Sequence, residues 1–269
     1  MLHAGLVSVT FRALVPREIV DLVRKAGLEG IEWGGDIHVP HGDLQRAQEV
    51  REMTLEAGLR VASYGSYYRV GHEEPAPFGV VLETALALGA PTVRVWAGKR
   101  GSAEADAAYR EQVAQDSRRI AELAAQAGVV VAYEFHGKTL TDTSASARAL
   151  LERVAHESLK TYWQPEVGAT VEEALAGLEA ILPWLANVHV FHWGGGFTER
   201  LPLAQGEEAW GRYLGRVAAA GGEHWAMLEF VREDAPQAFL EDAQTLKKLL
   251  ARVAGQRGSG DEIGKRGKV

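Results

Sequence analysis

Four polar residues in the second half of the chain each lie at or near the end of a short apolar run: Glu134, Gln164, His189 and Glu229. A carboxylate in this position loses hydration unless it binds a metal, pairs with a cation or reaches solvent. Together the four side chains offer three oxygens and one imidazole nitrogen, a set that suits one divalent ion such as Mn²⁺, Mg²⁺, Co²⁺ or Zn²⁺. The alternative is that each is an ordinary strand-end residue held by a neighbour.

Glycines at regular intervals indicate which elements would position these side chains. Gly27, Gly58 and Gly89 each end a helix-like stretch and are followed by a short apolar run. A left-handed glycine between a helix and a β-rich run is typical of a repeating strand–helix fold. Counting such units predicts eight strands, at about 4–9, 29–33, 60–64, 91–96, 129–134, 159–163, 187–192 and 225–230.

Eight strands that alternate with helices predict an α/β fold, a (β/α)₈ TIM barrel formed by a single domain. An open doubly wound sheet is the alternative, but no Gly-x-Gly-x-x-Gly turn follows the first strand. We expect the barrel to span residues 1–254 and the glycine-rich, charged segment 255–269 to be a disordered tail. Pro16 fits the first turn of a helix, and Asp142 or Thr143 fits a helix cap.

The composition limits the classes of function. The chain has 269 residues, of which 46% are hydrophobic, and a formal net charge of −7. This charge disfavours a nucleic-acid partner, because nucleic acids are bound by basic surfaces. There is no cysteine, so disulfides and thiolate metal sites are excluded. No apolar run is long enough to span a bilayer and no signal peptide is visible, so we expect a cytoplasmic protein with no membrane partner.

Aromatic and basic residues near the expected strand ends form a second set of candidates. Trp33, Tyr64 and Trp96 lie at the ends of three of the first four strands. Their ring faces suit the C–H faces of a sugar or polyol, although large hydrophobic residues also close the top of any barrel. Arg94 is a candidate contact for a phosphate group of the substrate, with a solvated loop charge as the alternative. Further candidate contacts at the rim are Glu32, His38 and His41.

Seven stretches carry a resemblance to a known family: GIEWGGDIHVPHGD (30–43), VASYGSYYRVG (61–71), ALGAPTVRVWAG (87–98), YEFHG (133–137), YWQP (162–165), VHVFHW (188–193) and LEF (228–230). Through them the chain resembles the xylose-isomerase-like TIM-barrel superfamily, the sugar phosphate isomerases and epimerases. The resemblance implies that Glu134 and Glu229 are both metal ligands and the acid/base pair. It also implies that His189 is the third ligand and that His136 contacts the substrate.

Two departures from the family pattern concern the metal ligands. The family usually has an aspartate where Gln164 stands. The glutamine therefore gives this site one negative charge fewer than the family pattern. The family often has an H-x-K-D pattern on the seventh strand, which here reads HVFH (189–192). We therefore expect His189 to bind the ion and His192 to contact substrate, with the opposite assignment as the alternative. Glu166, on the same side of an extended chain as Gln164, is a second candidate ligand.

The expected function is that of a metal-dependent isomerase or epimerase that acts on a ketose, polyol ketone or sugar phosphate through an enediolate. One glutamate would remove a proton and the other would return it. The alternatives are a sugar or inosose dehydratase with the same site and a non-catalytic sugar-binding barrel. A nuclease for abasic DNA is disfavoured, since it needs more His and Asp ligands and a basic track. The expected partner is a small-molecule sugar or sugar phosphate, and association into a homo-oligomer is left open.

Overall fold

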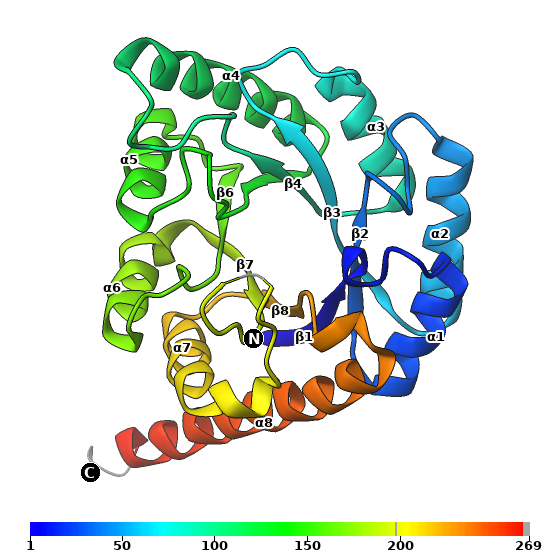
Figure 1. Ribbon diagram of the computed structural model, residues 1–269, viewed down its shortest axis with the longest axis vertical. Helices are drawn as coiled ribbons and strands as arrows, with labels where there is room; N and C mark the ends of the chain where they lie inside the picture. Colours follow the sequence, from blue (N-terminus) through cyan, green and yellow to red (C-terminus); the bar gives the residue numbers. More distant parts are fainter. Residues whose placement is uncertain (197, 266–269) are drawn as a thin grey trace.

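The computed structural model describes residues 1–196 and 198–265 of the chain, with side chains to residue 255. Within these residues, eight parallel strands close into a barrel in chain order, and the helices lie around its outside (Figure 1). The strands are β1 (Leu2–Val7), β2 (Gly30–Gly34), β3 (Arg60–Arg69), β4 (Thr92–Trp96), β5 (Val130–Tyr133), β6 (Leu159–Trp163), β7 (Leu185–Val190) and β8 (His224–Leu228). The predicted (β/α)₈ TIM barrel and its eight strands are confirmed.

The helices alternate with the strands along the whole chain. The α-helices are α1 (Pro16–Ala26), α2 (Leu44–Glu56), α3 (Phe78–Leu88), α4 (Ala107–Gln126), α5 (Ser144–Val154), α6 (Val171–Ile181), α7 (Glu207–Ala220) and α8 (Pro236–Lys265). Short 3₁₀ helices are η1 (Ser8–Phe11), η2 (Leu182–Trp184), η3 (Leu203–Gly206) and η4 (Arg232–Asp234).

Local sequence signals explain where several helices begin and end. Gly27 and Gly89 adopt the left-handed conformation after α1 and α3, with φ of 66° and 74°. Pro16 lies in the first turn of α1, where its missing N–H costs no hydrogen bond. Of the two residues expected to cap α5, Thr143 does so, because its hydroxyl accepts a hydrogen bond from the Ser146 N–H at 3.2 Å.

Several strands end one to five residues from the predicted position, and the differences at β1 and β3 shape the mouth of the barrel. β1 ends at Val7 because the chain turns into the buried 3₁₀ helix η1. β3 continues to Arg69, which pairs with Trp96 at the end of β4. The longer β3 places Tyr67 at the carboxyl end of the barrel instead of in a loop.

Side chains that alternate with those facing the helices fill the interior of the barrel. An apolar cluster lies there, separate from the larger core between strands and helices, and includes Val7, Ala62, Ala132, Tyr162 and Met227. Trp225 joins this cluster near the amino-terminal end of β8, and the Arg60 guanidinium lies over its ring. Gly30 on β2 leaves the space that the Trp225 ring occupies. Trp225 therefore closes the end of the barrel opposite to the mouth.

α8 is the last described element and continues to Lys265, beyond the expected end of the barrel domain at residue 254. That boundary stays a prediction, and residues 266–269 of the expected tail lie outside the described residues. In the part of the chain that the structure describes, no helix has the length and apolar character needed to cross a membrane.

Gly30→Ala tests the packing of this closed end. A Cβ at position 30 would lie 2.5 Å from Trp225 Cη2 and 2.7 Å from the Arg60 carbonyl oxygen. We expect the substitution to lower the free energy of unfolding by about 1–3 kcal/mol, the usual cost of overpacking. Gly215→Ala in α7 is the control, since no heavy atom lies within 4 Å of its added Cβ. Urea denaturation of both variants measures the effect, and equal stability of the two would contradict the packing argument.

Candidate active site

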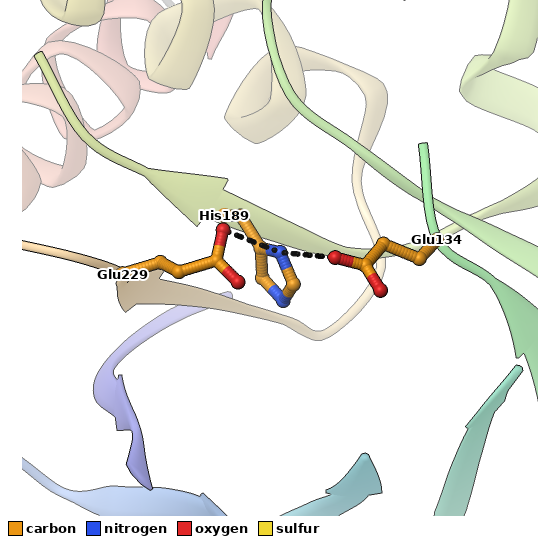
Figure 2. A group of neighbouring side chains, drawn as sticks. All are labelled: Glu134, His189 and Glu229. Carbon is orange, nitrogen blue, oxygen red and sulfur yellow. Dashed lines mark ion pairs between the residues drawn. The ribbon is translucent and has the colours of Figure 1, made fainter. Parts of the chain in front are cut away.

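Glu134, His189 and Glu229 meet at the carboxyl end of the barrel (Figure 2). The two glutamates directly follow β5 and β8, and His189 lies near the end of β7. His189 Nδ1 lies 3.2 Å from Glu229 Oε2 and 3.9 Å from Glu134 Oε1. All three side chains are buried, and one ligand atom from each lies within 4.8 Å of the others. The structure thus brings together three of the four expected metal ligands.

This group fits a divalent metal ion. Atoms that bind one ion at ~2.1 Å are roughly 3 to 3.5 Å apart, close to the two distances measured from His189 Nδ1. Both ring nitrogens of His189 are buried without a well-formed hydrogen bond, and each lies within 4 Å of a carboxylate oxygen. Such nitrogens are costly to bury unless something binds them. Figure 2 shows the imidazole between the two carboxylates, so that Nδ1 would be the nitrogen ligand.

The neighbouring carboxylates also control the charge of His189. Burial disfavours the charged imidazole, but the carboxylates of Glu229 and Glu32 outweigh burial and raise the pKa of His189 to about 9. His189 is therefore protonated near neutral pH when no ion is bound. Since a metal ligand must be neutral imidazole, an ion that binds at Nδ1 displaces this proton.

A buried ion pair lies beneath the group. Arg94 on β4 is 1% exposed, and its Nε donates to Glu32 Oε1 on β2 at 2.7 Å. Glu32 Oε2 accepts a hydrogen bond from Ser63 at 2.7 Å, and Oε1 lies 3.8 Å from His189 Nε2. Burial would raise the pKa of Glu32, but Arg94 outweighs it and holds the pKa well below its usual range. Glu32 is therefore inside the barrel instead of at the rim, and Arg94 supports the site from below instead of lining the cavity.

Arg94 also reaches the site itself. Its Nη1 forms an ion pair with Glu134 Oε2, and Trp96 Nε1 donates to the same oxygen at 2.5 Å. The other oxygen, Oε1, is the one that faces His189. Glu134 is thus fixed through one oxygen and offers the other to an ion.

A cavity of about 590 Å³ opens above the group. Its wall includes Arg12, Tyr67, Trp96, Glu134, His136, Asp142, Gln164, Glu166, Glu229 and Phe230. The rings of Trp96 and His136 stack with their centroids 4.2 Å apart and an interplanar angle of 24°. Burial lowers the pKa of His136, so its imidazole is neutral near pH 7. The expected contacts Trp96 and His136 therefore form one aromatic wall of the cavity.

The two candidate oxygen ligands after β6 differ in their surroundings. Gln164 lines the cavity, and its buried Oε1 has no hydrogen-bond partner. Glu166 instead accepts a hydrogen bond at 3.1 Å from the Ser144 N–H, at the start of α5. A carboxylate at a helix N-terminus is stabilised there. Gln164 is therefore the better placed of the two as a fourth ligand.

Three expected substrate contacts lie away from this cavity. Trp33 is buried against α2, where its Nε1 donates to Thr54 Oγ1 at 3.2 Å. Tyr64 is buried and donates its hydroxyl proton to the Val39 carbonyl oxygen at 2.7 Å. His192 lines a separate cavity of about 180 Å³. Trp33 and Tyr64 thus pack on the helix side of the barrel.

Two features of the site were not identified from the sequence. Arg12, which follows η1, lines the cavity although it lies beyond the end of β1. Its position just past a strand end is a signal, because such residues form the mouth of a TIM barrel. The pairing of Glu32 with Arg94 joins β2 to β4 across the interior. That pairing depends on strand register, which the sequence does not display.

The model of a known family matches most of the chain. That family, described as the xylose isomerase-like TIM barrel, matches residues 20–249. The chain belongs to the xylose isomerase-like TIM barrel family. The resemblance inferred from the seven sequence stretches is confirmed, and the matched range contains the three residues of the buried group.

Relatives and solved structures resemble the chain to different extents. One relative, from Bacillus anthracis, is named 3-dehydroshikimate dehydratase and is 29% identical over 189 residues, which cover 64% of this chain and 64% of the relative. The match thus spans less than two thirds of that relative's length. The crystal structure of the probable 3-DHS dehydratase AsbF from Bacillus anthracis has a TM-score of 0.76 at 22% identity, over 92% of this chain and 99% of that one. A protein of this fold from Mycobacterium smegmatis, in complex with magnesium, has a TM-score of 0.72 at 17% identity, over 93% and 97% of the two chains.

The protonation of His189 predicts how metal affinity depends on pH. Below the pKa of about 9, a proton competes with the ion for the imidazole. We therefore expect the affinity for Mn²⁺ to rise nearly tenfold per pH unit between about pH 6 and pH 8. Calorimetric titration in buffers of different ionisation enthalpy measures both the affinity and the protons released. An affinity that does not change over this range, with no proton released, would exclude His189 as a ligand.

Two substitutions of Gln164 test whether its carbonyl oxygen binds the ion. Gln164→Asp should tighten Mn²⁺ binding, because a carboxylate attracts a divalent cation more strongly than an amide oxygen does. Gln164→Leu should weaken it, since only Glu134, His189 and Glu229 remain. If the affinity of Gln164→Leu equals that of the wild type, Gln164 is no ligand, and Glu166→Gln becomes the variant to compare.

Proposed function

We propose that the chain binds one divalent metal ion through Glu134, His189 and Glu229 and uses it to remove water from a hydroxylated ketone. The observation that carries this proposal is the unequal environment of the two glutamates. Arg94 and Trp96 hold Glu134 through one oxygen, whereas Glu229 approaches the His189 imidazole at 3.2 Å. One fixed ligand and one proton acceptor suit an elimination, in which a single base is sufficient.

The relatives support the same reaction class. The partly matching Bacillus anthracis protein is named a 3-dehydroshikimate dehydratase. 3-Dehydroshikimate is a ring ketone with hydroxyl groups and one carboxylate, and a cavity of about 590 Å³ accommodates a molecule of that size. A dehydratase is also the alternative to an isomerase that the sequence predicts for this site.

Each residue of the site has a role in this reaction. A divalent ion held by Glu134, His189 and Glu229 would supply Lewis-acid chemistry, polarising the substrate carbonyl and acidifying the adjacent C–H group. Glu229 removes that proton, and the electron pair of the broken C–H bond forms a C=C bond as the C–O bond to the leaving hydroxyl breaks. Glu229 then delivers the proton to the departing oxygen, which leaves as water. Glu134, held by Arg94, stays a carboxylate throughout, and the neutral His136 ring positions the substrate against Trp96.

Epimerisation is the second candidate, and one observation favours it. Glu134 and Glu229 lie on either side of His189 (Figure 2), as a two-base inversion at carbon requires. In that reaction Glu134 would have to return a proton to the substrate. Its ion pair with Arg94 favours the charged carboxylate and opposes protonation.

Substitution of each glutamate tests the proposal with 3-dehydroshikimate and Mn²⁺. Glu229→Gln keeps an oxygen ligand but removes the base, so we expect kcat to fall by at least about 10²-fold. Glu134→Gln should lower kcat as far and also weaken Mn²⁺ binding, because a charged ligand is lost and Arg94 keeps only Glu32 as a partner. Glu152→Gln, on the outer surface of α5, is the control with unchanged turnover. The measurement is the absorbance of the conjugated product.

The solvent isotope separates the two candidate reactions. In D₂O, a dehydratase yields the dehydrated product, whereas an epimerase yields the inverted ketone with deuterium at the inverted carbon. Near-native turnover of Glu229→Gln would exclude Glu229 as the base. A panel of ketoses followed by NMR gives the opposite test. If it yields deuterated, inverted ketone without loss of water, the function is epimerisation and not dehydration.

A further inference from the structure

The charged residues of the cavity wall are unequally distributed. Glu134, Asp142, Glu166 and Glu229 contribute four carboxylates. Among the described residues that line the cavity, Arg12 is the single arginine, and no lysine lines it. Arg12 therefore carries the only arginine charge in the described part of the wall, and its pairing with Asp36 leaves part of the guanidinium accessible.

Arg12 is presented by a rigid turn. All four residues of η1 are buried, and the turn is tied to the end of β2 and to the segment that follows β8. Ser8 Oγ accepts a hydrogen bond from the Gly34 N–H at 2.9 Å, and Thr10 Oγ1 accepts one from the Phe230 N–H at 3.0 Å. Because Phe230 directly follows Glu229, the turn that carries Arg12 is fixed beside the candidate base.

The guanidinium itself is partly held and partly accessible. Nη1 of Arg12 donates to Asp36 Oδ2 at 2.5 Å, and the Arg12 side chain is 46% exposed. A guanidinium has five N–H donors, so the contacts of Arg12 with Asp36 and Tyr67 leave others that can bind a carboxylate through two parallel hydrogen bonds. Asp36 thus fixes the direction of the Arg12 side chain.

We propose that Arg12 binds a carboxylate of the substrate, so that the enzyme acts on hydroxylated keto acids. This inference rests on the proposed function, because the ion held by Glu134, His189 and Glu229 would bind the ketone end of the substrate. A singly charged carboxylate fits better than a doubly charged phosphate. Asp36 already balances much of the Arg12 charge, and no lysine or second arginine among the described residues lines the cavity. The substrate would lie between Arg12 and the Glu134–His189–Glu229 group, against the Trp96–His136 wall.

Two probes that differ only in the acidic group test this proposal. 3,4-Dihydroxybenzoate and catechol share the vicinal hydroxyls that can reach a bound ion, but catechol has no carboxylate. We measure the affinity of each by calorimetry for the Mn²⁺-loaded wild type, Arg12→Gln and Arg148→Gln. Arg148, on the exposed side of α5, pairs with Glu152 and does not line this cavity, so its variant controls for the loss of one positive charge.

We expect Arg12→Gln to weaken binding of dihydroxybenzoate by about tenfold to a hundredfold, the usual effect of losing hydrogen bonds between charged groups. Binding of catechol should change by less than about twofold, and Arg148→Gln should leave both affinities unchanged. Arg12→Lys should recover only part of the loss, because an ammonium cannot form the two parallel bonds. Melting temperatures of all variants show whether each is folded.

The outcomes separate failure of this inference from failure of the proposed function. The role of Arg12 would be overturned if Arg12→Gln lost the same affinity for both probes, or if the wild type did not prefer dihydroxybenzoate over catechol. Neither result would contradict the proposed dehydratase function. If the wild type bound inorganic phosphate more tightly than dihydroxybenzoate, and Arg12→Gln lost this binding, the group that Arg12 recognises would be a phosphate and not a carboxylate. If the Mn²⁺-loaded wild type binds neither aromatic probe, the proposed function fails and this inference fails with it.

Discussion

The buried guanidinium of Arg94 is the interaction on which the arrangement of the site depends. A charge with no partner in the interior of a barrel would cost several kcal/mol, so Arg94 must lie among carboxylates. It does so twice, with Glu32 on β2 and with Glu134 after β5. Each of these carboxylates lies in turn within 4 Å of a ring nitrogen of His189. One cation therefore fixes the positions of two acids and, through them, of the imidazole.

The charges of this network explain why a glutamine is tolerated next to it. Glu32, Glu134 and Glu229 carry three negative charges and Arg94 one positive charge, so a divalent ion with a neutral His189 would balance the group. An aspartate at position 164 would add a charge that nothing described in the interior offsets, whereas the unpaired Gln164 oxygen offers a ligand atom without one. When no ion is bound, the positive charge of protonated His189 offsets part of the negative charge of the carboxylates, in line with the raised pKa of His189. The same network distinguishes the two glutamates, because only Glu134 is bound by Arg94.

The fold and the centre of the site could be predicted from the sequence, because both leave a local pattern. Strand-ending glutamates after apolar runs identified Glu134 and Glu229, and repeated glycines identified the strand–helix units. The direction of each side chain could not be predicted in the same way. On β2 the alternation that turns Glu32 inward necessarily turns Trp33 outward, and an irregular register between β2 and β3 leaves Tyr64 facing the helices. The sequence shows the period of alternation but not its phase, so contacts across the interior such as Glu32–Arg94 stayed hidden.

The central claim is that these residues form a centre for one divalent ion, with Glu134 held by Arg94 as a ligand. Anomalous diffraction at the manganese edge, from crystals soaked in Mn²⁺ near pH 8, tests it most directly. The account predicts one strong peak at about 2.1–2.3 Å from Glu134 Oε1, His189 Nδ1 and a Glu229 oxygen, with the Arg94–Glu134 ion pair intact. The metal centre would be contradicted by the absence of a peak at this position. It would also be contradicted by an ion that binds only after Glu134 has turned away from Arg94.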